Sequence, residues 1–186
     1  MCISNELIDK LIEDIGMARY EHSIRVKNMA ERLSKVYGVD SSKAVIAGLL
    51  HDCGKFKDKT VLLNMLNKFD IILKNEYKDN LQLAHGILGA KLASEIYNIK
   101  DKEILNAIKY HTTGRKGMSA LEKIIYIADY IEEGRDFPGL DTVRKLAFED
   151  LDRSLIKALD NTIKHVINNG WILHTDTVEA RNSLIY

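Results

Sequence analysis

The sequence has few helix-breaking residues and no long hydrophobic run. Its 186 residues include a single proline, Pro138. No apolar stretch reaches the roughly 18 residues that predict a transmembrane helix. The N-terminal segment MCISNELIDKLIEDIG carries acidic residues where a signal peptide would be basic and then apolar. We therefore expect a cytoplasmic protein with no membrane partner.

The sequence also has only two cysteines and no net charge. Cys2 and Cys53 lie far apart and form no CxxC pair, which argues against a disulfide framework or a zinc knuckle and fits a reducing compartment. The 27 basic residues balance 27 acidic residues. Because nucleic-acid binding normally needs a basic surplus or a basic face, we expect no nucleic-acid partner. A small anionic substrate is still compatible with this balance.

Apolar residues recur at three- and four-residue spacing along the chain, and no segment shows the alternation of a strand. This spacing predicts an all-α protein. Its length and the lack of a linker or repeat predict one domain over residues 1–186. The expected helices cover residues 4–14, 19–37, 41–53, 83–97, 101–111, 119–133, 143–150 capped by Asp141, 151–169 and 175 onward, with one or two short helices in 60–79.

Four histidines fall within or at the end of four different predicted helices, and a fifth helix contains an aspartate in an apolar setting. Singly, each histidine is more often a core residue than a metal ligand. A buried carboxylate, however, must be paired, hydrogen-bonded or metal-bound, because burying the charge alone is costly. The residues are His22, His51 with the adjacent Asp52, His85, His111 and Asp129.

Together these side chains predict a metal centre. Imidazole and carboxylate are the ligands that iron, manganese, cobalt and zinc take in proteins. Helical bundles build such centres from inward-facing side chains on several helices. The ligand set is large enough for two metals, with Asp52 able to bridge them through its two carboxylate oxygens.

Several segments resemble the HD-domain phosphohydrolases. They are HSIRV at 22–26, LLHDCGK at 49–55, HGILGA at 85–90, IKYHTTGR at 108–115 and LEKIIYIADYIEEGRDFPG at 121–139. Within that family, HTTGR and GRDFPG resemble the YqeK-like symmetrical bis(5'-nucleosyl)-tetraphosphatases, and the similarity extends from about residue 17 to EARN at 179–182. The resemblance implies an HD-type helical bundle. It also implies metal-dependent hydrolysis of dinucleoside tetraphosphates, with diadenosine tetraphosphate giving two ADP.

The resemblance also implies which residues hold metal. One metal is expected at His22, His51, Asp52 and Asp129, and a second at Asp52, His85 and His111. The reaction would use water activated by two divalent metals, since such a pair can clamp the attacking and leaving oxygens. The family points to iron, but the ligands themselves leave manganese and cobalt open.

Substrate contacts are expected close to these ligands. Lys55 follows His51 by four residues and would share its helix face if the helix continued that far. Asp52 and Lys55 are the predicted catalytic residues. Amides, hydroxyls and guanidinium groups can cradle phosphate oxygens. The further candidates are Arg19, Arg25, Thr112, Thr113, Gly114, Arg115, Arg135 and Asp136. His165, His174 and Cys53 are expected to be structural or surface residues.

Other functions remain open at this point. A nucleotidase or a cyclic-dinucleotide phosphodiesterase could use the same scaffold. The phosphodiesterase branch should carry a GYP motif where this chain has HTTGR, and a single-metal nucleotidase would not need His85 and His111. A helical binding module with a relict site should have lost some ligands. An apolar face on a terminal helix would suit a homodimer, but core burial explains such a face equally well.

Overall fold

The structure, a computed structural model, describes residues 4–56, 58–73, 77 and 80–185. Within these ranges it contains α-helices, one short 3-10 helix and no strand, so the all-α prediction is confirmed. The elements are α1 (Asn5–Ile15), α2 (Met17–Tyr37), α3 (Ser41–Leu50), α4 (Lys59–Lys68), η1 (Leu81–Leu83), α6 (Ala84–Glu95), α7 (Lys102–Tyr110), α8 (Ala120–Ile131), α9 (Leu140–Glu149), α10 (Leu151–Asn168) and α11 (Thr175–Asn182).

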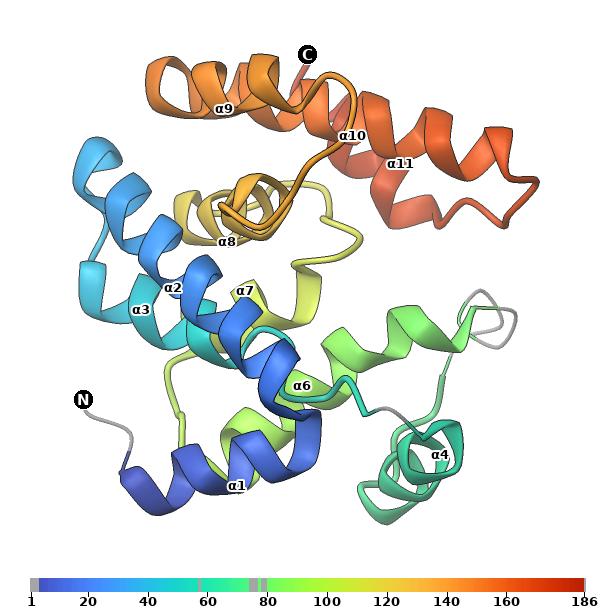
Figure 1. Ribbon diagram of the computed structural model, residues 1–186. Helices are drawn as coiled ribbons and strands as arrows, with labels where there is room; N and C mark the ends of the chain where they lie inside the picture. Colours follow the sequence, from blue (N-terminus) through green and yellow to red (C-terminus); the bar gives the residue numbers. More distant parts are fainter. Residues whose placement is uncertain (1–3, 57, 74–76, 78–79, 186) are drawn as a thin grey trace.

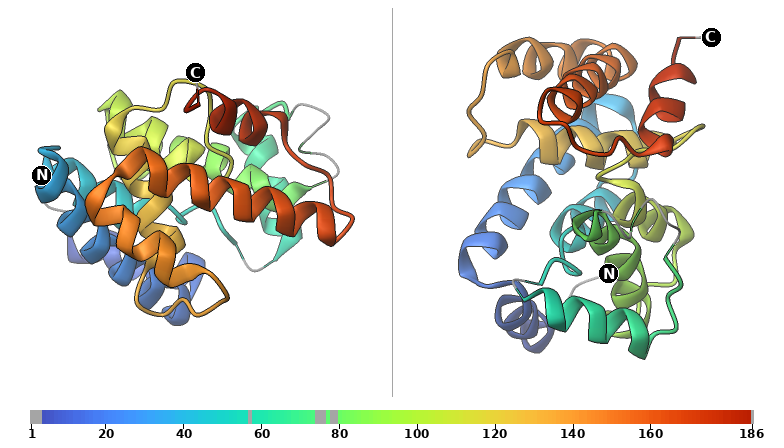
Figure 2. Two further views of the ribbon diagram at one scale, coloured as in Figure 1. Left: turned by 90° about the horizontal axis from the view of Figure 1, so that it is seen from above. Right: turned by 90° about the vertical axis from the view of Figure 1, so that its right-hand side faces the viewer.

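The helices lie in three tiers (Figures 1 and 2). Helices α9, α10 and α11 cover one side, and α1, α4 and α6 lie on the opposite side. The middle tier holds α2, α3, α7 and α8: α2 packs against α3 and α8, while α7 packs against α3, α6 and α8. Helices α2, α3, α7 and α8 therefore form the interior, and α6 joins them through its contact with α7.

Local capping signals place several helix ends where the sequence predicts them. Ser4 caps α1 and accepts a hydrogen bond from the backbone N–H of Leu7. Asp40 caps α3, and Ser119 forms a capping box with Glu122 at the start of α8. Gly38 ends α2 with a left-handed backbone, φ 65°.

Two predicted boundaries are wrong. Helix α3 ends at Leu50 rather than near Cys53, and the chain then turns, with the N–H of Lys55 bonded to the carbonyl of Asp52. Lys55 is thus not on a continuing helix face. Asp141 is not a cap either: α9 begins at Leu140 after a left-handed Gly139 (φ 86°), and Asp141 lies in the first turn, where its charge favours the helix dipole.

The segment between α3 and α6 is only partly described. The short helix predicted within residues 60–79 is present as α4, and residues 71–73 are not helical. Part of the remainder, residues 74–76 and 78–79, lies outside the described residues, as does Cys2.

Close backbone approaches bring the centre together. A Cβ added at Gly54 would lie 2.5 Å from the carbonyl oxygen of His85 and 2.6 Å from the amide nitrogen of Gly89. The turn after α3 therefore packs directly on the backbone of α6. A residue with a side chain at position 54 would prevent this close approach.

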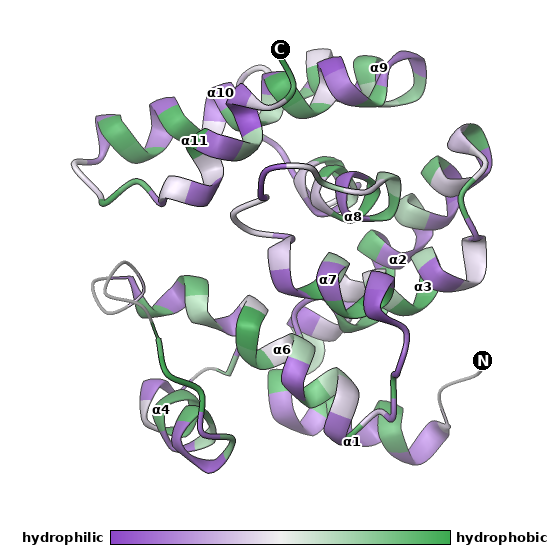
Figure 3. Cartoon of the chain, turned by 180° about the vertical axis from the view of Figure 1, so that it is seen from behind, coloured by the Kyte–Doolittle hydropathy of each residue, from purple (hydrophilic) through white to green (hydrophobic). Residues whose placement is uncertain are grey.

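Hydropathy alternates along the helices, and most carry both hydrophobic and hydrophilic residues (Figure 3). None of the helices in the described part of the chain combines the length and apolar character needed to cross a bilayer. The apolar faces instead point into one buried cluster that surrounds the middle tier.

Candidate metal centre

The structure brings the four histidines and two aspartates together. They come from α2, the end of α3, the start of α6, the end of α7 and the last turn of α8: His22, His51 with Asp52, His85, His111 and Asp129. The imidazole rings stand in a row, with centroid separations of 5.2 Å for His22–His51, 5.0 Å for His51–His111 and 4.8 Å for His111–His85. His51, Asp52, His85 and His111 are buried.

Three of the histidines are oriented by main-chain carbonyls in the same way. The Nδ1–H of His51 donates to Gly48 O over 2.8 Å, and that of His111 donates to Ile108 O over 2.7 Å. The Nδ1–H of His85 donates to Gln82 O. Each acceptor lies three residues earlier. Gly48 and Ile108 are in the last turns of α3 and α7, where carbonyls lack intrahelical partners, and Gln82 is in η1 before α6. Because a carbonyl cannot donate, Nδ1 carries the proton, and each Nε2 points into the centre as an acceptor.

These Nε2 atoms converge closely enough to need a cation. The Nε2 atoms of His85 and His111 lie 2.9 Å apart. Two facing lone pairs repel at that distance, but ligand atoms at right angles around one metal, with bonds of about 2.1 Å, lie about 3 Å apart. Among the described residues, His51 Nε2 has no hydrogen-bond partner although it is fully buried. The donor set therefore fits a bound metal.

Asp52 presents its two oxygens to different histidines. Its Oδ1 lies 3.1 Å from His85 Nε2 and 3.5 Å from His111 Nε2, yet no aligned hydrogen bond reaches this atom within the described chain. Its Oδ2 lies 3.6 Å from His51 Nε2. This division is the arrangement that a bridging carboxylate requires.

Asp129 completes the other end of the row. Its Oδ1 lies 3.0 Å from His22 Nε2 and 4.0 Å from His51 Nε2. Two groups of potential ligand atoms each lie within 4.8 Å of one another: His22, His51 and Asp129, and His51, Asp52 and His111. Imidazole nitrogens with carboxylate oxygens suit divalent transition metals, so the centre is compatible with divalent metal binding.

The electrostatics keep these groups in their ligand forms. Burial lowers the pKa of His51 to about 4 and also lowers the pKa of His85. Burial opposes ionisation of Asp52, but the neighbouring His51, His111 and His85 outweigh it and hold its pKa well below the usual range. Neutral imidazoles and ionised carboxylates are the forms that bind metal, so His51, His85 and Asp52 do not have to lose protons first.

The pKa of Asp129 is likewise set by burial on one side and by neighbouring groups on the other. Burial would raise its pKa, but the hydrogen bond with His22 and the charges of His51 and Arg135 lower the pKa well below its ordinary value. The carboxylate is therefore ionised at neutral pH. The Nη2 of Arg135 donates to Asp129 Oδ1 over 2.6 Å, and its Nε donates to the backbone carbonyl of Asp129.

The predicted phosphate contacts divide into two groups, of which the first lies at the centre. Arg19 Nη1 donates to Asp52 Oδ2 over 2.6 Å, and Lys55 Nζ lies 3.6 Å from the same oxygen. Thr112 Oγ1 lies 3.1 Å from His111 Nε2 and 3.3 Å from His85 Nε2. With Arg135, these residues place three cations and a hydroxyl beside the ligands.

The second group is engaged elsewhere. Arg115 forms a bidentate pair with the buried Glu122, over 3.0 and 2.7 Å, and its guanidinium stacks on Tyr110. Thr113 is buried and donates to Gly114 O, and Gly114 has a left-handed backbone, φ 66°. Asp136 is exposed. The roles of these four residues in substrate binding stay predictions.

Glu132 is a residue of the site that the sequence analysis missed. It is buried, accepts from Arg25 Nε over 2.5 Å and from the N–H of Gly134 over 2.6 Å, and its Oε1 lies 3.2 Å from His22 Nδ1. It thus orients His22 as the carbonyls orient the other histidines, and Arg25 acts through it. Its spacing of three residues after Asp129 was the available signal, since residues three apart share a helix face.

The residues set aside as structural have structural contacts. Cys53 is buried, its thiol donates to Gly89 O over 3.3 Å, and burial raises its pKa. His174 caps α11. His165 lies in the last turn of α10 with its ring against Trp171. The EARN segment docks α11 on α10 through a 2.9 Å bond from Arg181 to Asp160.

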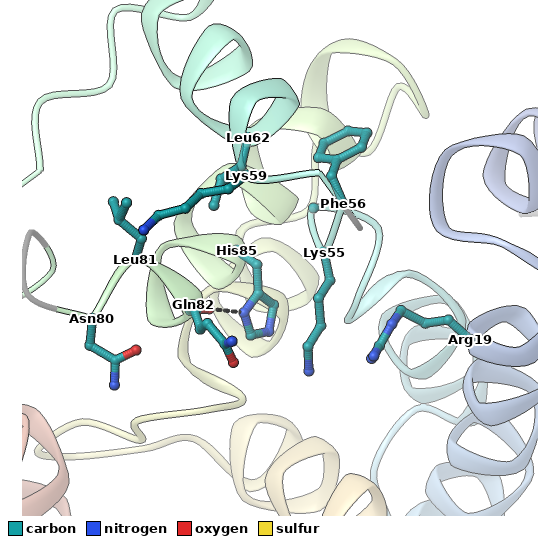
Figure 4. A pocket seen from close by; sticks show the side chains of 10 residues that line it. Arg19, Lys55, Phe56, Lys59, Leu62, Asn80, Leu81, Gln82 and His85 are labelled. Atoms are coloured by element: carbon teal, nitrogen blue, oxygen red, sulfur yellow. Dashed lines mark hydrogen bonds between the residues drawn. The ribbon is translucent and has the colours of Figure 1, made fainter. Parts of the chain in front are cut away.

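Three cavities open beside the centre. The smallest, of about 240 Å³, is lined by His111, Thr112, Tyr126, Asp129, Tyr130, Arg135, Phe137 and Thr162. The other two share Arg19 and Lys55. One, of about 470 Å³, is lined by Arg19, Gly54, Lys55, Phe56, Lys59, Leu62, Asn80, Leu81, Gln82 and His85 (Figure 4). The other, of about 440 Å³, is lined by Ile15, Gly16, Ala18, Arg19, His22, Arg25, Lys55, Glu132, Gly134 and Arg135. Small-molecule sites are commonly cavities of this size.

Comparison with known proteins agrees with this geometry. Residues 19–134 match the family model of the HD domain. The symmetrical bis(5'-nucleosyl)-tetraphosphatase of Halalkalibacterium halodurans is 42% identical over 171 residues, which cover 90% of this chain and 89% of that protein. The Bacillus subtilis protein of the same name is 40% identical over 167 residues, with 90% and 89% covered.

A solved structure is also similar. It is the crystal structure of a Clostridium acetobutylicum protein described as a predicted HD superfamily hydrolase involved in NAD metabolism. The two chains share 47% identity and superpose with a TM-score of 0.94 over 100% of this chain and 98% of the other.

Proposed function

The chain belongs to the HD-domain family and groups there with the symmetrical bis(5'-nucleosyl)-tetraphosphatases. From this membership we propose that it is a metal-dependent hydrolase of dinucleoside tetraphosphates. Diadenosine tetraphosphate would give two ADP. Water adds to a β-phosphorus, the central phosphoanhydride bond breaks, and ADP leaves.

The observation that carries this proposal is the divided carboxylate of Asp52. One oxygen faces His85 and His111, and the other faces His51 and the cation of Arg19. When bound, two divalent metals would lower the pKa of water toward neutrality and neutralise phosphate charge. We propose iron as the physiological metal, with manganese and cobalt as alternatives that the same ligands accept.

The chain's own residues supply positioning and charge. Phosphoanhydride hydrolysis needs little covalent chemistry from a protein, because the attacking water, phosphorus and leaving oxygen mainly have to be aligned and negative charge neutralised. Lys55 and Arg19 line both of the larger cavities beside Asp52, and Arg135 lines the smaller of these two. We assign these three residues to the phosphates, and Thr112 to a hydrogen bond beside His85 and His111.

The test is product analysis. Metal-loaded protein is incubated with diadenosine tetraphosphate, and nucleotides are separated by ion-exchange chromatography. ADP as the sole product supports symmetrical cleavage, whereas AMP with ATP would exclude it. Running the reaction in ¹⁸O-labelled water should place one label in one of the two ADP molecules, because one water is consumed per bond broken.

The alternatives are tested in the same assay. Nucleoside monophosphates and cyclic dinucleotides, supplied in parallel, report nucleotidase or phosphodiesterase activity. Protein that binds metal but turns over none of these substrates would be a binding module with a relict site. A cytoplasmic location, nucleotide binding and a homodimer stay predictions; size-exclusion chromatography with light scattering checks the last.

A further inference from the structure

The two larger cavities meet at the same pair of cations. Arg19 and Lys55 line both, and both approach Asp52 Oδ2, at 2.6 and 3.6 Å. Their volumes, about 470 and 440 Å³, are similar. A polyphosphate lying across Arg19 and Lys55 would therefore have one cavity at each end.

The cavities differ in chemistry. The first has an apolar wall formed by Phe56, Leu62 and Leu81, the side-chain amides of Asn80 and Gln82, and the cations of Arg19, Lys55 and Lys59. We call it the leucine cavity. The second is lined mainly by charged groups, including Arg25, Glu132 and Arg135, and we call it the arginine cavity.

Figure 4 shows how polar and apolar groups are separated within the leucine cavity. The polar ends of Gln82, Lys55 and Arg19 lie on the same side as the His85 ring, with Asn80 at the far end of this row. Leu62 and Leu81 lie on the opposite side, where the Lys59 side chain runs between them. The cavity thus offers an apolar wall facing a row of hydrogen-bonding groups that leads to the centre.

Such a cavity suits a nucleoside. A base has apolar faces and a polar edge, and binding sites for such molecules combine an apolar lining with a few placed polar groups. The arginine cavity has Ile15 and Ala18 as its apolar side chains and is lined by three arginines, so it suits phosphate better. We propose that the leucine cavity binds one nucleoside of the substrate, with Leu81 and Asn80 as contacts and its phosphates directed toward Lys55 and Arg19.

This inference rests on the proposed function, and it adds that the two equal halves of the substrate are held unequally. One nucleoside lies against the leucines, while the other half, in the arginine cavity, is held mainly through charge. The half bound only through charge has fewer contacts to break and should leave first after cleavage.

The experiment separates nucleoside binding from phosphate binding. ADP and inorganic pyrophosphate carry the same number of phosphates, but only ADP has a nucleoside. Each is titrated calorimetrically into the metal-loaded chain and into its Leu81→Ala and Asn80→Ala variants. We expect each variant to bind ADP about five- to tenfold more weakly, as loss of a contact worth roughly 1–1.4 kcal/mol would give. Pyrophosphate affinity should not change.

Leu63→Ala is the matched control. Leu63 is an exposed leucine on α4, next to the cavity residue Leu62, and it does not line the leucine cavity. The control should bind ADP like the unchanged chain. Metal content and the circular dichroism spectrum, measured on every variant, confirm that each is folded and loaded.

Two results would overturn the inference: unchanged ADP affinity in both variants, or equal weakening of ADP and pyrophosphate. Its failure is distinct from failure of the proposed function. Cleavage of diadenosine tetraphosphate with no effect of Leu81→Ala on ADP binding would leave the hydrolase and remove the nucleoside site. If the variants lost ADP binding but not pyrophosphate binding, and the unchanged chain cleaved no tetraphosphate, the nucleoside site would stand and the proposed function would fail.

Discussion

Asp52 links the two halves of the centre, because its oxygens face different histidines. Asp52→Asn keeps the size of the side chain but removes its charge. We expect bound metal to fall and turnover of diadenosine tetraphosphate to drop at least about 100-fold, since the shared ligand is lost. Elemental analysis per chain and steady-state kinetics measure the two effects. Full metal content and normal turnover in this variant would show that Asp52 is not a ligand.

Glu132 holds His22 in place and offers a sharper test of orientation. In Glu132→Gln, the amide oxygen can keep the bonds from Arg25 and Gly134, which both donate to Oε2, and the amide nitrogen would then face His22 Nδ1. Because that nitrogen cannot accept from Nδ1–H, the His22 ring should lose its fixed position. We expect metal affinity to fall about 10- to 100-fold, with turnover partly restored by excess metal. Competition with a chelator of known affinity measures the change.

The neighbouring Glu133→Gln is the control for that variant. The Glu133 side chain is 76% exposed and lies 3.7 Å from the exposed Arg32, so its loss should leave metal affinity unchanged. Equal effects of the two substitutions would mean that Glu132 acts through net charge rather than through His22.

The residue types of the centre could be predicted from the sequence, but some of their partners could not. Asp129 stands out because it is a charged residue within an apolar helix. The carbonyls of Gly48, Gln82 and Ile108 have no side-chain signal, since every residue carries one. Nothing local in the sequence shows that Arg115 pairs with Glu122, seven residues later.

At the scale of helices, the contact between the turn after α3 and α6 sets the spacing of the centre. A methyl group at Gly54 would meet backbone atoms at 2.5 and 2.6 Å, which cannot move without shifting α6 and His85. We expect Gly54→Ala to lower the free energy of unfolding by about 1–3 kcal/mol or more and to weaken metal binding. Urea denaturation and metal analysis test both.

Gly117→Ala provides the comparison. Nothing lies within 4 Å of its added Cβ, and its φ of +70° carries only the backbone cost of a left-handed residue, about 1 kcal/mol. Its metal affinity should be normal. If Gly54→Ala behaved like Gly117→Ala, the close approach would not be needed for the centre.

A helix end could be predicted from the sequence where a local cap determines it. It could not be predicted where tertiary contacts determine it. Gly38 ends α2 through its own left-handed backbone. In contrast, LLHDCGK contains no breaker before Gly54, so the pattern predicts a helix to Cys53. The helix stops at Leu50 because the following residues turn to place His51 and Asp52 in the centre and Gly54 against α6.

For the whole molecule, metal binding should be coupled to stability, because the ligands come from five separate helices. At a free metal concentration about 100 times the dissociation constant, binding stabilises the folded state by about 2.7 kcal/mol. For a chain of this size the midpoint of thermal unfolding should rise by about 5–10 °C. Calorimetry with metal and with chelator measures the shift.

Asp52→Asn should lose most of this metal-dependent shift while remaining folded. A midpoint that is the same with metal and with chelator in the unchanged chain would contradict binding across the five helices. The all-α class followed from apolar spacing alone, whereas the way α6 and α7 bring His85 and His111 together depends on contacts distant in sequence, which spacing does not encode.

The carbonyl acceptors of His51, His85 and His111 have a consequence for how this centre tolerates mutation. Main-chain atoms are the same whatever amino acid is encoded, so no single codon change deletes the oxygen that fixes these rings. His22 alone relies on a side chain, that of Glu132. Among the four histidines, a mutation of the hydrogen-bond partner can therefore reorient only the ring of His22, through Glu132.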